Sequence, residues 1–161
     1  MADASRDGDE NQVSFRLARA DDVPAIVAML ADDPLGAARE SVGEPLDEGY
    51  RTAFEAVEAS PDNELIVAES GGAVVGCLQL TFIPGLSRRG ALRGQIESVR
   101  VGRDARGGGV GARMIDWALA RARKRGCEIV QLTSDASRTD ARRFYERLGF
   151  VASHIGLKRS V

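Results

Sequence analysis

The sequence has 161 residues, 43% of them hydrophobic and 29% charged, so it can close a hydrophobic core and is unlike a disordered chain. Its 22 Lys and Arg residues and 24 Asp and Glu residues give a net charge of −2, which excludes the strongly basic balance of a typical nucleic-acid-binding domain. No apolar run approaches the roughly 20 residues that cross a bilayer, and the acidic N-terminus differs from a secretory signal. We expect a polar tail at residues 1–12 and one cytoplasmic domain over 13–161, with neither nucleic acid nor a membrane as partner.

Hydrophobic periodicity and turn residues predict the elements in chain order. The first half predicts a strand over 13–17, a helix capped by Asp21 or Asp22, a loop over 32–44, a helix over 46–59, and strands over 65–69 and 73–82 joined at Gly71-Gly72. The second half predicts an exposed loop over 84–94, a strand over 95–101, a helix that follows the glycines of 107–111 and ends at Gly126, a strand over 128–133, a helix over about 139–148, and extended chain from Phe150. This order implies an α/β fold of the α+β type, with a mixed sheet and helices packed on it.

A glycine-rich stretch separates the strand over 95–101 from the longest predicted helix. It contains Gly107, Gly108, Gly109 and Gly111. Glycine lets a ligand approach the backbone, and the first amides of a helix lack internal partners and lie at its positive end. The stretch therefore predicts an anion site; the alternative is a tight turn, for which one or two glycines suffice.

Two nucleotide-binding patterns compete for the same glycines. Gly107-x-Gly109-x-x-Ala112 formally matches the dinucleotide fingerprint of Rossmann domains. That fingerprint belongs on the first strand–helix unit of a doubly wound sheet, whereas here it follows three consecutive strands and too few residues remain for a second half. The phosphate loop of nucleotide hydrolases lacks its Gly-Lys-Ser/Thr ending here.

Three segments resemble one known family. Arg106-x-x-Gly109-x-Gly111 resembles the Arg/Gln-x-x-Gly-x-Gly/Ala signature of the GNAT superfamily of acyl-CoA-dependent N-acetyltransferases. The strand over 97–101 is similar to the one that precedes this signature, and Ala141-x-x-Phe144-Tyr145-x-x-x-Gly149-Phe150 is similar to the family's last helix. The resemblance covers residues 13–160 and implies the GNAT fold: a central, mostly antiparallel sheet of six to seven strands, whose fourth and fifth strands splay apart, and about four helices.

The resemblance also implies ligands and binding residues. Acetyl-CoA is the implied co-substrate, without a metal, a primary amine on a small molecule or peptide is the implied acceptor, and a homodimer is possible because members of this family often pair. Backbone groups of Val99 and Val101 would pair with the pantetheine arm, and amides of 106–112 would hold the pyrophosphate. The implied cofactor-binding residues are Val99, Arg100, Val101, Arg106, Gly107, Gly108, Gly109, Val110, Gly111, Ala112 and Arg138. Arg138 stands where many members carry an Asn that contacts CoA.

Direct attack of an amine on a thioester, through a tetrahedral intermediate, needs a base, an oxyanion donor and a proton for the leaving thiolate. By resemblance, Tyr145 is the acid and the Val99 amide is the oxyanion donor; Glu97 is the candidate base, directly or through water. The alternatives are a core tyrosine and an exposed strand carboxylate. Strict alternation places Glu97, Val99 and Val101 on one face unless a bulge near Val99 intervenes. His154, the only histidine, is expected at the surface or edge of a terminal strand.

Two other functions stay open. One is a non-catalytic acyl-CoA-binding sensor or regulatory domain on the same fold, and the other is a nicotinamide-dependent dehydrogenase that uses the same glycines. In the acetyltransferase interpretation, the acceptor enters beside the loops at 32–48 and 84–94. Cys77 and Cys127 are expected to be two buried free thiols.

Overall fold

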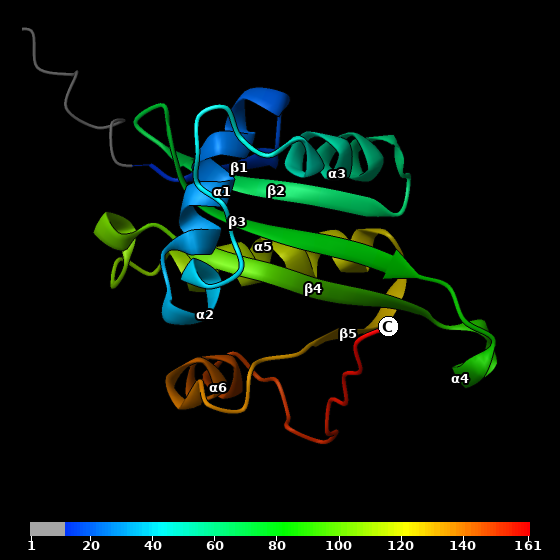
Figure 1. Ribbon diagram of the computed structural model, residues 1–161. Coiled ribbons are helices and arrows are strands. Elements are labelled where there is room, and N and C mark those ends of the chain that lie inside the picture. Colours follow the sequence, from blue (N-terminus) through cyan, green and yellow to red (C-terminus); the bar gives the residue numbers. More distant parts are fainter. Residues whose placement is uncertain (1–11) are drawn as a thin grey trace, which may run out of the picture.

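The computed structural model describes residues 12–161, and most of the predicted N-terminal tail lies outside this range. One mixed sheet with the order β1-β2-β3-β4-β5 runs through the molecule (Figure 1). Its strands are β1 (Ser14–Leu17), β2 (Asn63–Ser70), β3 (Ala73–Ile83), β4 (Leu92–Val101) and β5 (Cys127–Leu132). The first four pair antiparallel in sequence order, and β5 runs parallel to β4. This mostly antiparallel order excludes the doubly wound sheet of a dinucleotide-binding domain.

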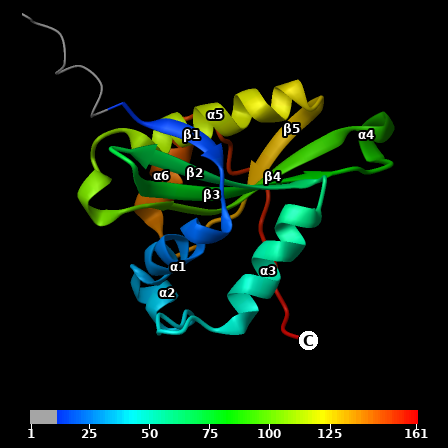
Figure 2. The ribbon, with the colours of Figure 1, turned by 90° about the horizontal axis from the view of Figure 1, so that it is seen from above.

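Helices cover both faces of the sheet (Figure 2), with α5 on one face and α1 and α3 on the other. The α-helices are α1 (Val23–Ala31), α2 (Pro34–Ala37), α3 (Glu48–Ala59), α4 (Ser87–Gly90), α5 (Val110–Lys124) and α6 (Thr139–Arg147). Two short 3₁₀ turns, η1 (Ala20–Asp22) and η2 (Arg103–Ala105), precede α1 and the glycine-rich stretch. None of the helices in the described part of the chain is long and apolar enough to cross a membrane.

Two apolar clusters hold these layers together. On one face, Met114, Ile115 and Ala118 of α5 pack without solvent exposure against Leu80 and Ile96. Each fully buried aliphatic side chain of this kind stabilises the fold by about 1.5–3 kcal/mol. The second cluster, on the other face, consists of Ile26, Met29, Val67 and Cys77, which join α1 to β2 and β3. The β-sheet is therefore anchored on both sides near the strand ends that carry the glycine-rich stretch.

Several sequence expectations are wrong. The expected exposed loop over 84–94 contains α4 and the start of β4 at Leu92, and the described chain has six α-helices where about four were expected. The loop over 32–44 contains α2, because the Asp33 carboxylate accepts hydrogen bonds from the Leu35 and Gly36 amides and so caps a turn that Pro34 begins. Asp22 is the N-cap residue of α1, as expected, but its side chain makes no capping hydrogen bond to the helix; its carboxylate accepts a 2.7 Å hydrogen bond from the Arg19 amide and pairs with Arg16.

The sheet of the described chain has five strands, not six or seven, because residues 151–161 form no strand. β5 has only β4 as a neighbour, so these last residues pair with nothing in the sheet, and Ile155 and Leu157 remain 90% and 92% exposed. His154 is therefore exposed outside any strand, beside the hydroxyl of Ser153.

Candidate functional site

The edge between β4 and β5 opens toward the glycine-rich stretch. Parallel pairing between the two strands ends at Ile96 and Leu132, so residues 97–101 continue without a neighbour on that side. Beyond Leu132 the chain leaves the sheet and runs to α6 (Figure 1). The predicted splay of the fourth and fifth strands is confirmed, and it exposes one backbone edge of β4.

A β-bulge decides how the side chains of β4 point. Cys77 pairs with Arg100 and Gln79 pairs with Glu97, which leaves two residues of β4 opposite the single Leu78. Ser98 adopts a left-handed backbone with φ of 55°, an unusual conformation for a residue with a side chain. Glu97 is therefore exposed on the face opposite α5, while Val99 packs against the core on the α5 side. Strict alternation would place these two side chains on the same face of the sheet, but the bulge places them on opposite faces.

The glycine-rich stretch leaves the N-terminal end of α5 uncovered. Gly107 and Gly109 are exposed with φ of 81° and 75°, and a Cβ added at either would meet nothing within 4 Å. No side chain caps the helix at Gly109. The first helical hydrogen bond runs from the Arg113 amide to the Gly109 carbonyl, so the preceding amides of the first turn have no helical acceptor. Open space, free amides and the positive end of a 15-residue helix fit a phosphate group.

A cavity of about 590 Å³ lies at the splayed edge of β4, and the predicted binding residues from Gly107 to Ala112 are not part of its lining. It is lined by Ala31, Asp32, Asp33, Ala37, Val99, Arg100, Val101, Arg103, Arg106 and Arg138. Five of the predicted binding residues (Val99, Arg100, Val101, Arg106 and Arg138) therefore surround one space, and its size and its guanidinium groups suit a phosphorylated ligand such as CoA.

Two aspartates that the sequence analysis missed organise these arginines. Asp32 pairs with Arg103 at 2.5 Å and with Arg106 at 2.8 Å, and Asp33 pairs with Arg138 at 3.0 Å and with Arg100 at 3.3 Å. The sequence pattern Asp33-Pro34, typical of a helix start, could have indicated α2 and thereby Asp33.

The charges around the cavity shift the pKa of both carboxyl groups. The hydrogen bond from Arg103 holds the pKa of Asp32 below its usual value, and Arg106 adds to the effect. Burial raises the pKa of Asp33, but the Gly36 amide and the charges of Arg100 and Arg138 outweigh it, and the net pKa is lowered. Both groups are therefore anionic at neutral pH and neutralise part of the arginine charge.

Two carbonyls of β4 are already engaged by arginines. Arg106 Nε donates to the Val101 carbonyl at 3.0 Å, and Arg100 Nη1 donates to the Val99 carbonyl at 2.9 Å. Arg100 Nε is buried without a hydrogen-bond partner. Because a carbonyl oxygen can accept two hydrogen bonds, a ligand that pairs with the Val101 carbonyl either shares it with Arg106 or displaces Arg106.

Helix α6 lies beside the same edge. The Phe144 ring is 3.3 Å from the position of a Cβ at Gly111 and packs against the core cluster that includes Val101. Next to it, Tyr145 makes edge contacts with Phe144 at 5.1 Å and with Phe150 at 6.0 Å between ring centroids. Burial raises the pKa of Tyr145, although Arg138 and Arg100 act in the opposite direction. The phenol is thus protonated at neutral pH and lies within electrostatic reach of the cavity arginines.

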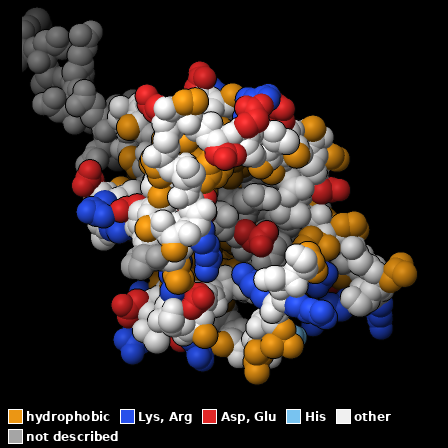
Figure 3. Space-filling model, in the orientation of Figure 1, with side chains coloured by type: hydrophobic (Ala, Val, Ile, Leu, Met, Phe, Trp, Pro, Cys, Tyr) orange, Lys and Arg blue, Asp and Glu red, His pale blue; other side chains and the backbone are white. Residues whose placement is uncertain are grey.

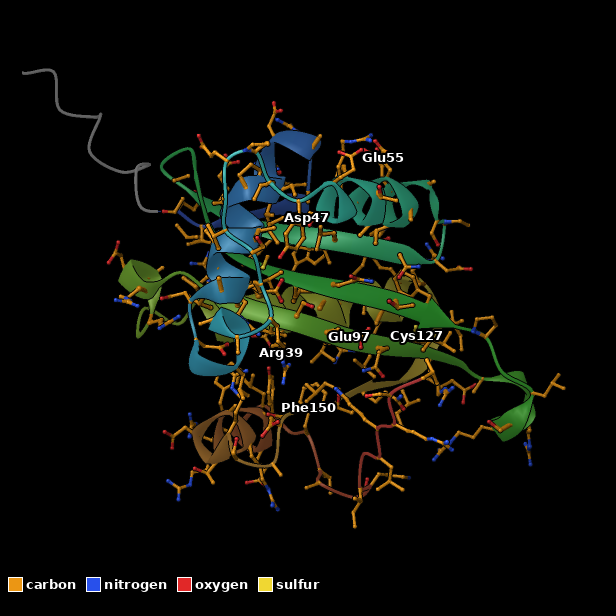
Figure 4. All side chains as sticks on the ribbon, viewed as in Figure 1. Arg39, Asp47, Glu55, Glu97, Cys127 and Phe150 are labelled. Carbon is orange, nitrogen blue, oxygen red and sulfur yellow. The ribbon has the colours of Figure 1, made fainter. Side chains whose placement is uncertain are left out.

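The predicted residues do not all meet at one point. Glu97 lies on the open side of the sheet (Figure 4), across from Gln79, and His154 lies in the exposed C-terminal segment. Among residues 12–161 we find no group of three His, Cys, Asp or Glu side chains arranged to hold a metal ion. Both cysteines are free, as expected, but only Cys77 is fully buried and Cys127 is half-buried.

Comparisons with known proteins agree with this geometry. A chain described as a transcriptional regulator from Bacillus halodurans C-125 is 48% identical and superimposes with a TM-score of 0.91 over 93% of this chain and 100% of that one. Aminoalkylphosphonate N-acetyltransferase from Salmonella typhimurium is 30% identical over 71% of this chain and 73% of its own length.

The fold recurs at lower identity. A predicted acetyltransferase from Clostridium acetobutylicum, whose crystal structure includes acetyl-CoA, is 18% identical with a TM-score of 0.69 over 91% of this chain and 96% of that one. The sequence profile of the acetyltransferase (GNAT) family matches residues 17–150, which include all the cavity residues. With the splayed sheet and the open glycine-rich helix start, this match shows that the chain belongs to the GNAT family of acetyltransferases.

Proposed function

We propose that the protein transfers the acetyl group of acetyl-CoA to a primary amine by direct attack of the amine. The observation that carries the proposal is the splayed edge of β4, which lines a cavity together with Arg106, three residues before the uncapped start of α5 at Gly109. An extended phosphorylated thioester fits this arrangement at both of its ends.

The chain offers separate groups to each part of acetyl-CoA. The first amides of α5, from Val110 to Ala112, would hold the pyrophosphate, with Arg106 and Arg138 beside them. The backbone of β4 at Val99 and Val101 would pair with the pantetheine arm, while Arg106 either shares the Val101 carbonyl or leaves it. The thioester supplies an activated acetyl group.

The reaction moves two protons as well as the acetyl group. A bond forms between the amine nitrogen and the acetyl carbon while the carbon–sulfur bond breaks, and the nitrogen, which becomes positively charged on attack, loses its second proton to water as the thiolate leaves. An alkyl ammonium has a pKa near 10.4, so the proton must first be removed, and the exposed Glu97 carboxylate accepts it directly or through water. The Val99 amide donates to the carbonyl oxygen as negative charge develops there.

Tyr145 acts on the departing sulfur as a hydrogen-bond donor. Burial raises its pKa, whereas a thiol has a pKa near 8.5, so complete proton transfer from the phenol to the thiolate is uphill. A charge-assisted hydrogen bond stabilises the thiolate without that transfer. The phenol therefore contributes through its position and its protonated state.

Release of free thiol from acetyl-CoA in the presence of amines tests the proposal. The Glu97→Gln variant should lower kcat/KM for amines by about 10²-fold, with unchanged affinity for acetyl-CoA. Glu128→Gln is the matched control, because Glu128 is also an exposed strand carboxylate, on β5. Equal activity of the two variants would remove Glu97 from the mechanism.

A second candidate function is regulatory. The relative from Bacillus halodurans is described as a transcriptional regulator and shares 48% identity with this chain. A non-catalytic acyl-CoA sensor on this fold would bind acetyl-CoA, as measured by calorimetry, and would release no thiol with any amine tested. An acetyltransferase must both bind acetyl-CoA and release thiol when an amine acceptor is present.

A further inference from the structure

One sheet face beside Glu97 carries uncharged polar side chains in a single row. Asn63, Thr81, Gln95 and Gln131 stand opposite one another on β2, β3, β4 and β5, and the pairing register places them in one line across the sheet. Residues on one rung of a sheet point to the same side, and here that side is opposite α5, because the neighbouring Ile96 packs into the α5 cluster. The next rung places Gln79 beside Glu97. We call these six residues the amide platform.

Among residues 12–161, no element buries the amide platform completely. Glu97 and Gln131 are exposed and the other four residues are half-buried. In Figure 3 this face is hollowed at its centre, and the hollow shows mostly white surface, which is backbone or uncharged polar side chains, with an acidic group where Figure 4 labels Glu97. α1 covers the sheet farther along, over Val67 and Cys77. A row of polar side chains in a concave surface is therefore open to a small ligand.

Three hydrogen bonds within the platform hold its side chains together, each using one donor. Gln79 Nε2 and Thr81 Oγ1 both donate to Asn63 Oδ1, at 3.1 and 2.7 Å. Gln131 Nε2 donates to Gln95 Oε1 at 2.8 Å.

The groups that remain include both acceptors and donors. Among the described residues, the side-chain oxygens of Gln79, Gln131 and Glu97 accept no hydrogen bond from protein, and the Gln79 and Gln131 amide nitrogens each keep a second N–H. Gln95 Oε1 and Thr81 Oγ1 each take part in one of these hydrogen bonds and keep a further lone pair. The exposed platform thus offers acceptors and donors together, which matches hydroxyl groups because a hydroxyl both donates and accepts.

We propose that the amide platform selects the acceptor of the acetyl group, and that this acceptor is a hydroxylated primary amine such as an amino alcohol or an amino sugar. This inference rests on the proposed function, since it places the amine at Glu97. Adjacent same-face positions along β4 lie about 7 Å apart and neighbouring strands about 5 Å apart. A ligand with its nitrogen at Glu97 therefore places hydroxyls four to six bonds away over Gln95 and Thr81.

The same geometry disfavours two other kinds of amine. An alkylamine of equal length would cover the platform oxygens without providing donors to them. A compact amine with a phosphonate group would bring negative charge beside the Glu97 carboxylate, and the nearest arginine on this face of β4, Arg100, is already paired with Asp33.

The first test compares three classes of amine in the free-thiol assay: glucosamine and 1-amino-1-deoxysorbitol, hexylamine, and 2-aminoethylphosphonate. We expect kcat/KM for the hydroxylated amines to exceed that for the other two by at least about tenfold, the value of one to two hydrogen bonds. Preference for hexylamine or for the phosphonate overturns the platform inference and leaves the proposed function standing. Bound acetyl-CoA with no thiol release from any amine overturns both.

The second test uses variants of the platform. Gln95→Leu and Thr81→Val should each raise KM for the hydroxylated amines about tenfold, while kcat, activity with hexylamine and affinity for acetyl-CoA stay within twofold. Activity with hexylamine in the same preparation shows that the variant is folded. Gln12→Leu is the matched control, because Gln12 is an exposed glutamine outside the platform. Equal loss for hexylamine and for the hydroxylated amines would refute a role of Gln95 and Thr81 in selection.

Discussion

Two glycines at opposite ends of α5 allow the phosphate site to be tested apart from stability. Gly109 precedes the helix with φ of 75°, and Gly126 follows it with φ of 80°. A Cβ at either position meets nothing within 4 Å. Gly109→Ala and Gly126→Ala therefore impose the same backbone strain without a steric clash, but only the first alters the N-terminal end of α5.

The two variants should lose equal stability. A left-handed conformation costs an alanine about 1–2 kcal/mol, and the smaller entropy of the unfolded chain offsets about 0.4–1 kcal/mol of this cost. The net loss is about 1 kcal/mol for each variant, or a decrease in Tm of about 2–4 °C for a chain of this size. Chemical denaturation and thermal unfolding measure both values.

The affinity for acetyl-CoA should differ between Gly109→Ala and Gly126→Ala. A methyl group at 109 projects into the space where the amides of α5 would meet a phosphate, so the loss of one charge-assisted hydrogen bond predicts a decrease of about 10- to 100-fold in affinity. Gly126→Ala should bind acetyl-CoA like the unmodified protein in isothermal titration calorimetry. If the two variants bind with the same affinity, the phosphate does not lie at the N-terminal end of α5.

Three further predictions follow from side chains already described. Tyr145→Phe should lower kcat about 10- to 100-fold and leave KM for acetyl-CoA unchanged, since the phenol acts only as the thiolate forms; a change in KM alone, measured by steady-state kinetics, would contradict this role. The hydrogen bond from Arg16 lowers the folded-state pKa of Asp22, so the stabilisation from this pair is complete above the unfolded pKa near 3.9 and is lost as the pH falls through the folded value. Asp22→Asn should therefore lower the free energy of unfolding by a constant amount above about pH 5 and by less below about pH 4. Urea denaturation at several pH values measures this difference, and a difference that stays the same in acid would contradict the prediction. Burial raises the pKa of the Cys77 thiol to about 12, so at pH 8 a thiol reagent should modify Cys127 first in the native protein. Mass spectrometry of the labelled chain measures the order of labelling. Prompt labelling of Cys77 would contradict its burial.

Local sequence patterns predicted the elements that depend on neighbours in the chain. Alternation and the Gly71-Gly72 turn located β2 and β3, and the glycines before Val110 marked the start of α5. These features are specified within a few residues, which is the range that periodicity and capping can report. The resemblance at 106–111 supplied the splay of β4 and β5, which no local pattern encodes.

The remaining features depend on contacts between distant residues. Asp33 and Arg138 are 105 positions apart, and nothing in either local sequence predicts their ion pair. The sequence allowed a bulge near Val99 but did not predict it. The left-handed backbone of Ser98 is imposed by the pairing of Cys77 and Gln79 with β4, and no glycine marks the position. The expected terminal strand is absent because a strand requires a partner, and alternating apolar residues alone do not provide one.

The carboxylates at Asp32 and Asp33 have a consequence for behaviour in salt. An anion that recruits Arg106 or Arg138 must displace a carboxylate that lies 2.8 or 3.0 Å from the guanidinium, so binding exchanges one ion pair for another. Added electrolyte weakens both the old pair and the new one. The affinity for an anionic ligand should consequently depend less steeply on ionic strength than it would in a cavity whose arginines had no carboxylate partners. Asp32 and Asp33 act as built-in counter-ions of these arginines.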